Sequence, residues 1–216
     1  MSPRHARVLR DQGEAGSPGA ALHRHLIAVT QRLLAAHGSA GLTTREIARE
    51  AQVADGLLYN HFASKDDLVA TALGERATEL VHDFLAARPE PGTATLEENL
   101  ATLARAVFDF NACMVPLVTG LFGQADLLHA FFSDFHTGQV GPRAAFTAAV
   151  EYVSAEQRLG RAADDVDPVA VVEMLLGACL VRALAAQMGQ AADSGPQADL
   201  DAIVSVLVRA LHRPTT

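Results

Sequence analysis

The chain has 216 residues, half of them hydrophobic, with few aromatic residues, no Trp and a formal net charge of −8 at pH 7. This length allows one domain or two small ones around a sizeable core, and the abundance of Ala, Leu and Val favours helices over sheets. No apolar stretch follows the N-terminal arginines, which argues against a secretory signal. Glu173 and Arg182 interrupt the most apolar segment, 166–188, which argues against a membrane span, so we expect a cytoplasmic protein.

The charge is distributed unevenly along the chain. Residues 1–65 hold 8 of the 17 Lys and Arg but only 5 of the 25 Asp and Glu, a net charge of +3, which leaves −11 on the remainder. A mildly basic head on an acidic body suggests two functions in one chain. Because a chance distribution of surface charge gives the same pattern, charge by itself does not identify a partner.

The N-terminal third predicts a disordered arm followed by short helices. Residues 1–19, rich in Arg, Gly, Ser and Pro without periodicity, predict a disordered basic arm. Apolar residues at helical spacing predict a helix over 20–37. A capping box at 43–46 opens a short second helix, and a third helix is expected from residue 54 or 55 to residue 62.

The remainder of the chain predicts longer helices. Ser64, with Asp67 three residues later, caps a helix to about residue 87, and a second capping box, Thr95 with Glu98, opens a helix to about Cys113. Prolines and glycines then break the middle of the chain into shorter pieces, at Pro116, Gly120, Gly123, Gly138 and Gly141-Pro142. The last two helices are expected over 168–188 and 198–212. The fold class is therefore all-α, with about nine helices and no sheet.

The stretch GLLYNHFASKDDL, residues 56–68, has the pattern of a DNA-reading helix. On a helical wheel Leu58 and Phe62 share an inner face, whereas Gly56 and Asn60 point outward. Two short helices with a tight connection, the second presenting an outward polar face, follow the plan of a helix-turn-helix. Asn60 can pair with adenine, and the exposed Leu57 can pack on a thymine methyl group.

Three residues near the end of this helix suit phosphate contacts. Tyr59, His61 and Lys65 carry donors, and such contacts position a protein on DNA without reading sequence. The alternative for Tyr59 and His61 is packing against the first and fourth helices, and for His61 the two interpretations are about equally supported.

A set of residues in fixed register resembles the DNA-binding signature of the TetR family of bacterial transcriptional regulators. The resemblance covers about residues 20–68 without gaps and rests on Thr44, Ile47, Ala48, Ala51, Val53, Leu58, Tyr59, His61, Phe62, Lys65 and Leu68. It implies a helix-turn-helix DNA-binding domain over 20–66 and a ligand-binding and dimerisation domain over 67–216. It also implies phosphate roles for Thr44, Tyr59, His61 and Lys65, and a groove face made of Gly56, Leu57 and Asn60.

The chain departs from the family pattern at the turn. Gln52 stands where many members place glycine, so a residue with a Cβ is expected to hold a positive φ. Ala54 stands where Ser or Thr often caps the recognition helix, and Asp55 is the remaining candidate for the cap. We include Asp55 among the predicted DNA-binding residues, although it brings negative charge toward the phosphates.

The resemblance implies a homodimeric, effector-released repressor of a near-palindromic operator. The alternative is a helical-bundle ligand-binding protein or enzyme that has lost operator binding. Ala54 and Asp55, which depart from the family pattern, are the residues that suggest it. A structural nucleoid protein fits poorly with a charge of only +3 on the head. We expect no enzymatic activity, because no phosphate-binding loop or nucleophile-elbow motif occurs.

The dimer is expected to form through the last two helices. The helix over 168–188 is apolar on most sides, and the helix over 198–212 repeats this character. A helix that is apolar all round must bury its second side against something, and the same two helices of a second chain are the expected partner. The alternative is a core helix buried within one chain.

A ligand site is expected where aromatic residues gather. Seven of the nine Phe fall between Phe108 and Phe146, in the segment interrupted by Pro and Gly. The candidate ligand-binding residues are Phe108, Asn111, Phe122, Phe131, Phe132, Phe135, Phe146 and Arg182. An acidic body favours a neutral or cationic lipophilic effector over an anionic one. The alternative is an aromatic core without a cavity.

Neither a cofactor nor a metal site is expected. His129 and His136 can share a helix face, but no carboxylate or Cys completes a site. The two cysteines, Cys113 and Cys179, lie far apart within apolar runs and predict buried free thiols rather than a disulfide.

Overall fold

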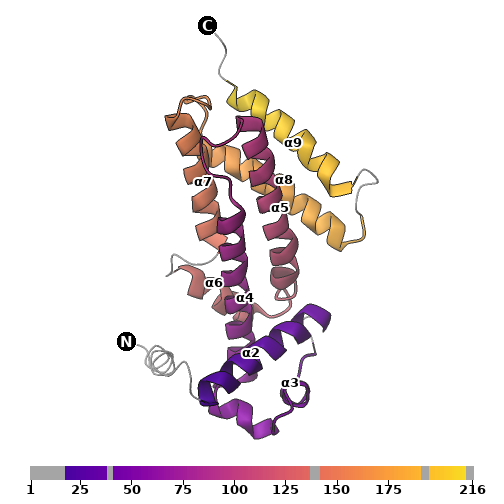
Figure 1. Ribbon diagram of the computed structural model, residues 1–216. Helices are drawn as coiled ribbons and strands as arrows, with labels where there is room; N and C mark the ends of the chain where they lie inside the picture. Colours follow the sequence, from indigo (N-terminus) through magenta and orange to yellow (C-terminus); the bar gives the residue numbers. More distant parts are fainter. Residues whose placement is uncertain (1–17, 38–40, 137–141, 191–194, 213–216) are drawn as a thin grey trace. The chain divides into compact units, whose positions relative to one another are not determined.

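The computed structural model describes residues 18–37, 41–136, 142–190 and 195–212. These residues form eight α-helices and one 3-10 helix, and none of them lies in a strand (Figure 1). The predicted all-α fold class is confirmed. The basic arm predicted over 1–19 lies outside the described residues except for its last two, which begin the first helix, and the predicted breaks at Gly138 and Gly141 lie outside them as well.

The chain divides into two compact units. The first, which we call the head unit, contains the described residues up to Arg76 and the segment Gly120–Phe131. The second, the body unit, contains Ala77–Thr119 and the described residues after Phe131. Two helices, α4 (Lys65–Ala87) and α6 (Ala125–His136), contribute residues to both units.

The head unit is built from α2 (Pro18–His37), α3 (Thr44–Glu50), the 3-10 helix η2 (Asp55–Asn60) and the first turns of α4. Each helix contributes buried apolar side chains to its core, among them Leu26, Ile27, Ile47, Leu58 and Leu68. Gln31 on α2 donates a hydrogen bond to the carbonyl of Ala72 on α4, 3.1 Å away. Apolar burial and this hydrogen bond together hold the helices of the head unit against one another.

Side-chain caps begin α3 and α4 as the sequence predicts. The Thr43 hydroxyl accepts from the Glu46 amide at 3.2 Å, and the Ser64 hydroxyl accepts from the Asp67 amide at 3.1 Å. The Asp67 carboxylate reaches back to the Ala63 amide, one residue before Ser64, at 2.8 Å. These bonds satisfy first-turn amides that have no partner within the helix.

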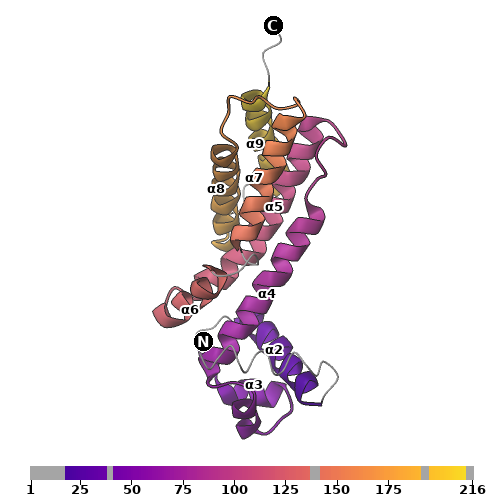
Figure 2. The same cartoon turned by 90° about the vertical axis from the view of Figure 1, so that its left-hand side faces the viewer.

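The body unit is a bundle that contains α5 (Leu96–Thr119), α7 (Pro142–Arg158), α8 (Pro168–Gln187) and α9 (Gly195–Leu211). The helix α8 packs against α5, α7 and α9, and α9 also packs against α5 (Figures 1 and 2). The Asp167 carboxylate caps α8 by accepting from the Val169 amide at 2.9 Å, as the Asp-Pro pair predicts.

Helix α5 is longer than the sequence indicates. The prediction that it ends near Cys113 is wrong, because α5 continues through Pro116 to Thr119. Pro116 is exposed, so water can reach the carbonyl one turn earlier that loses its amide partner. Cys113 lies on the same exposed side of α5, which corrects the expectation that its thiol is buried. Cys179 is buried and both cysteines are free, as predicted.

Two helices, α5 and α8, are long and apolar enough to cross a membrane by length and composition alone, with mean hydropathies of 1.3 and 2.1. In α5, contacts with α8 and α9 account for this apolar character. In α8, only 28% of the most apolar window is buried within the chain, and large apolar side chains such as Met174 and Val181 are exposed in a single copy.

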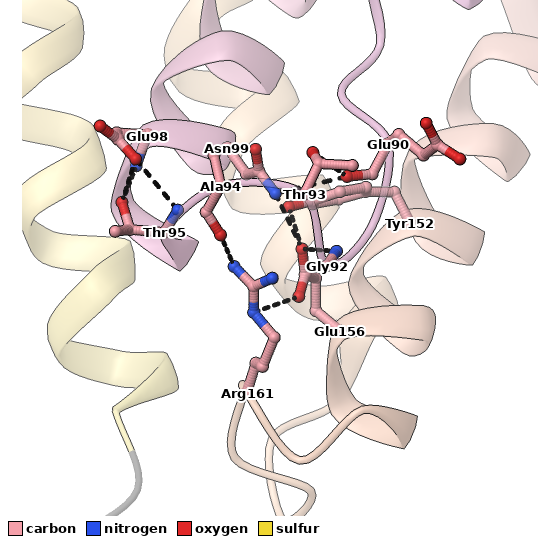
Figure 3. Close-up of polar contacts among 10 residues, drawn as sticks. All are labelled: Glu90, Gly92, Thr93, Ala94, Thr95, Glu98, Asn99, Tyr152, Glu156 and Arg161. Atoms are coloured by element: carbon pink, nitrogen blue, oxygen red, sulfur yellow. Dashed lines mark hydrogen bonds and ion pairs between the residues drawn. The ribbon is translucent and has the colours of Figure 1, made fainter.

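A buried carboxylate joins four segments of the body unit (Figure 3). The Glu156 side chain on α7 is only 1% exposed, and its Oε1 atom accepts three hydrogen bonds. The donors are the Gly92 amide at 3.2 Å, the Asn99 side chain at 3.1 Å and the Tyr152 hydroxyl at 2.7 Å. Its Oε2 atom lies 3.1 Å from Nε of Arg161, which also donates to the carbonyl of Ala94.

This Glu156 cluster sets how the start of α5, the end of α7 and the loop before α5 meet. Gly92 lies in the α4–α5 loop, Asn99 in the first turn of α5 and Arg161 in the turn after α7. Burial, followed by the hydrogen bond and the negative charge of Glu156, raises the pKa of Tyr152, so this hydroxyl remains a donor. Removing one of the four partners of this buried charge lowers the stability of the fold, because the charge is then left without full compensation.

We expect Glu156→Gln to lower the free energy of unfolding by about 3 kcal/mol, because it leaves the cationic Arg161 beside a neutral amide in a buried site. Urea unfolding monitored by circular dichroism measures the change. The matched control is Glu151→Gln on the exposed side of the same helix, expected to change stability by about 0.5 kcal/mol or less. Equal effects of the two substitutions would contradict the role given to the cluster.

Candidate nucleic-acid interface

The turn between α3 and η2 is closed by a pair of backbone hydrogen bonds. The Gln52 amide donates to the carbonyl of Arg49 at 3.2 Å, and the Val53 amide donates to that of Ala48 at 2.9 Å. This pattern is a Schellman motif, which requires a left-handed residue directly after the helix. Gln52 is that residue, with φ of 57°, as the sequence predicts.

The segment after the turn is a 3-10 helix rather than the α-helix used for the sequence analysis. It covers Asp55–Asn60 and ends before Phe62, because its bonds join Leu57 to Ala54 and His61 to Leu58, three residues apart. The predicted faces are nevertheless confirmed: Leu58 and Phe62 are buried, whereas Gly56 and Asn60 are exposed.

The tighter helix rearranges the exposed face. Since residues three apart eclipse in a 3-10 helix, Gly56 lies in line with Tyr59, and Leu57 in line with Asn60. Tyr59 is 57% exposed and Leu57 is half-buried. The outward face therefore consists of two short rows, one with the glycine and the phenol and one with the leucine and the amide.

The predicted cap by Asp55 is wrong. No side chain caps η2, whose N-cap residue is Ala54, because Asp55 is already the first residue of the helix. Its carboxylate instead lies 3.7 Å from Nε of Arg45, near the start of α3. Arg45 was missed by the sequence analysis; the opposite charges that flank the turn are the signal that could have found it.

Three of the four residues with expected phosphate roles border one shallow depression. Thr44, Tyr59 and Lys65 surround it, and buried Leu58, Phe62 and Leu68 with Ser64 complete its lining. Nζ of Lys65 donates to the carbonyl of Leu42 at 3.2 Å and lies 3.8 Å from the Asp66 carboxylate. The structure thus places Thr44, Tyr59 and Lys65, from three different helices, around one depression of the head unit.

The fourth residue, His61, is half-buried and takes part in ring packing. Its ring centroid lies 6.0 Å from that of His23 on α2, and the His23 ring stacks on Phe62 at 4.5 Å. His25 approaches the carbonyl of Ala51 at 3.2 Å. These contacts join α2 to the ends of α3 and η2, a role for His23 that the sequence analysis did not identify.

The candidate ligand residues are divided between the two units. Phe122 and Phe131 belong to the head unit; Phe131 is buried, whereas Phe122 is 67% exposed. Phe108, Asn111, Phe146 and Arg182 belong to the body unit. Asn111 is buried and donates to the carbonyl of Val107 at 2.8 Å, and Arg182 donates to that of Ala178 at 3.3 Å. The side chains of Phe132 and Phe135 lie outside the described residues.

Two short helices, a left-handed turn between them and an exposed polar face on the second define a helix-turn-helix protein. Residues 26–72 match the family model described as "Bacterial regulatory proteins, tetR family". This match confirms, over residues 26–72, the resemblance to the TetR family noted in the sequence. A comparison with curated proteins gives no match.

Solved structures with the same fold extend the similarity over both units. A TetR-family transcriptional regulator from Mesorhizobium loti is 18% identical with a TM-score of 0.73, over 91% of this chain and 100% of that one. A regulator from Saccharomonospora viridis in complex with choline is 16% identical with a TM-score of 0.67, over 90% and 100%. FadR from Bacillus subtilis in complex with stearoyl-CoA is 18% identical with a TM-score of 0.61, over 88% and 99%. At these identities the similarity shows the fold.

We expect Gln52→Gly to raise the free energy of unfolding by up to about 1 kcal/mol, because glycine holds a positive φ without the steric cost that a Cβ brings. Urea unfolding measures the change. Gln52→Ala, which keeps the Cβ and loses the amide, is the control and should not stabilise the protein. Stabilisation by both substitutions to the same degree would show that the backbone angle is not the cause.

Proposed function

We propose that the chain is a homodimeric transcriptional repressor that binds a near-palindromic DNA operator and is released by a small lipophilic effector. The observation that carries the DNA-binding part is the convergence of Thr44, Tyr59 and Lys65 around one depression beside the exposed Asn60. Donors at the edge of a recognition helix suit phosphates, and an amide on its outward face suits base edges.

Gly56 supports the proposal that the backbone of η2 approaches the major groove closely. A methyl group at this position would meet no atom within 4 Å, and the residue does not adopt a positive φ. The fold of the head unit therefore does not require glycine here. In the proposed complex, the missing side chain lets the η2 backbone approach base edges, while Leu57 in the adjacent row packs on a thymine methyl group.

In the operator complex Asn60 contacts base edges and Lys65 contacts phosphate. We expect Asn60→Ala to change the sequence preference, costing about 1–3 kcal/mol at one base pair. We expect Lys65→Ala to weaken binding to all sequences and to reduce the salt slope by about one unit. Mobility shifts on duplexes from the upstream region of the chain's own gene, at several salt concentrations, measure both. Equal losses for Asn60→Ala on operator and random DNA would contradict its assignment.

The same mobility shift tests the alternative of a helical-bundle protein without operator binding. Asp55 carries negative charge on the exposed face, which is the feature that favours this alternative. The Arg45 guanidinium beside it offsets that charge. Absence of specific binding by the unmodified chain would favour the alternative.

The uncovered face of α8 supports a homodimer. Met174 and Val181, seven residues apart on α8, and Met188, the C-cap residue that follows it, are 57%, 64% and 66% exposed. Gly177 lies on α8 with open space around it, and Val206 on α9 is exposed as well. Other apolar residues of α8 that suggested this interface, such as Leu175 and Cys179, are buried within the chain.

A second copy of this face is the proposed cover, because an isologous contact of α8 and α9 buries the exposed apolar stripe on both chains at once. Glu173 and Arg182 on α8 make lipid a poor cover, since a charge at the centre of a membrane helix costs about 2.5–3.5 kcal/mol on the insertion scale. We therefore place the protein in the cytoplasm.

We expect Val181→Glu to dissociate the dimer at micromolar concentration, because it places two carboxylates in an apolar contact. Sedimentation velocity measures the mass. The matched control is Leu85→Glu on α4, another exposed apolar residue of the body unit, which should leave the mass unchanged. An unmodified chain that sediments as a stable folded monomer would refute the dimer.

The effector is proposed to bind among the aromatic residues of the body unit. Phe108 and Phe146 are half-buried there, and the set includes the polar groups of Asn111 and Arg182. Structures of the same fold hold stearoyl-CoA, which joins a long acyl chain to an anionic CoA group, and choline, a small cation. The acyl chain supports a lipophilic effector for this chain, and choline supports a cationic one. The acidic body favours a neutral or cationic one. Phe122 is too exposed to belong to this site.

We expect a lipophilic cation to raise the melting temperature and weaken operator binding together, and tenfold release requires about 1.4 kcal/mol of coupling. Phe146→Trp, which adds volume at the site, should reduce both responses while DNA affinity stays unchanged. Phe122→Ala is the control and should keep both responses. A compound that stabilises the protein without weakening operator binding would contradict the coupling.

A further inference from the structure

An exposed ion pair spans the turn of the helix-turn-helix. Nε of Arg45, the second residue of α3, lies 3.7 Å from Oδ2 of Asp55, the first residue of η2, and the two side chains are 89% and 62% exposed. An ion pair this exposed contributes little to stability. Asp55 does not cap η2, so the fold of the head unit does not explain the pair.

The pair lies on the surface that the proposed function directs toward DNA, and the inference below rests on that function. Arg45 follows Thr44, which borders the depression, and Asp55 precedes Gly56 on η2. A carboxylate at this place is repelled by phosphates, and a hydrogen bond that it accepts from a base offsets this cost. The base-edge donors of the major groove are the amino groups of cytosine and adenine.

We propose that Arg45 and Asp55 together read one C·G base pair in each operator half-site. In the major groove this pair presents two acceptors, O6 and N7 of guanine, beside one donor, N4 of cytosine. Arg45 presents N–H donors and Asp55 an acceptor, and the two groups lie side by side, with Nε and Oδ2 3.7 Å apart. An A·T pair offers the carboxylate a donor as well, but it lacks the two neighbouring guanine acceptors that match the guanidinium fork.

The geometry of the ion pair leaves the guanidinium able to make this contact. Asp55 faces Nε, so the two Nη groups at the far end provide the parallel donors for O6 and N7. Asp55 then has two effects: it accepts from cytosine and it orients Arg45. The negative charge of Asp55 lowers the affinity for every duplex, because it is repelled by phosphates. At the matching base pair the hydrogen bond to cytosine restores this affinity, so the carboxylate adds to sequence specificity.

The test is selection of duplexes from a random pool by the full-length chain and its variants, followed by affinity measurements on the selected site. We expect each selected half-site to contain a C·G pair whose replacement by A·T weakens binding about 5- to 150-fold. Arg45→Ala should remove this penalty. Asp55→Asn should move the preference at the cytosine toward adenine, because an amide pairs with N6 and N7 of adenine.

Two exposed residues of the same helix serve as matched controls. Arg49→Ala and Glu50→Gln make equal charge changes on α3 and should leave the base preference at every position unchanged. Melting temperatures within about 2 °C of the unmodified chain show that each variant keeps its fold.

The outcomes separate this inference from the proposed function. If the unmodified chain selects an operator whose base preferences do not change in Arg45→Ala and Asp55→Asn, the inference is wrong and the regulator stands. The inference is also wrong if Asp55→Asn raises affinity equally for all duplexes, since the carboxylate then only repels phosphate. If the unmodified chain enriches no duplex, the DNA-binding function itself is refuted, and this inference with it.

Discussion

The outward face of the head unit depends on one left-handed backbone residue. Gln52 follows the C-cap residue of α3 with φ of 57°, and the two hydrogen bonds of the Schellman motif, donated by the amides of Gln52 and Val53, direct the chain into η2. Were this residue to adopt an extended conformation, η2 would leave α3 in another direction, and Tyr59 would no longer border a depression together with Thr44. A strained backbone angle is kept here because buried Ile47, Leu58 and Phe62 hold the elements on both sides of it.

The body unit depends on a different kind of constraint, a buried charge. Glu156 accepts hydrogen bonds from a loop amide, a side-chain amide and a phenol, and it pairs with Arg161. Apolar contacts between helices tolerate small shifts along the helix axis, whereas directional bonds to one carboxylate do not. The Glu156 cluster therefore fixes the relative positions of the ends of α5 and α7, while the apolar contacts of α5, α8 and α9 supply most of the burial.

Charge has opposite uses in the two units. In the body unit Glu156 is enclosed, with three hydrogen bonds to Oε1 and an ion pair at Oε2, so its charge stabilises one arrangement of the chain. In the head unit Asp55 and Arg45 are open to solvent, so their attraction is worth little to the fold and remains available to a partner. Burial decides this difference, because the same pair of charges interacts strongly in a medium of low polarity and weakly in water.

Local patterns in the sequence determined the helices and most of their caps. The capping box at Thr95–Glu98, the Asp167 cap before Pro168 and the inner face with Leu58 and Phe62 all follow from residues within a few positions of each other. Such interactions are local in the chain, so a linear pattern contains them. Helix boundaries were harder: α5 passes through Pro116 because packing of the helix outweighs one missing amide.

Only the tertiary structure decided which residues meet across the chain. The gathering of Gly92, Asn99 and Arg161 around Glu156, the stacking of His23 on Phe62, and the approach of Arg45 to Asp55 join residues that no spacing rule relates. It also decided which apolar residues of α8 are enclosed and which remain open, since a helix apolar on every side carries no periodic signal. The sequence by itself determined the class of fold and the helix that we propose to face DNA; the contacts that give each surface its chemistry came from the packing of distant segments.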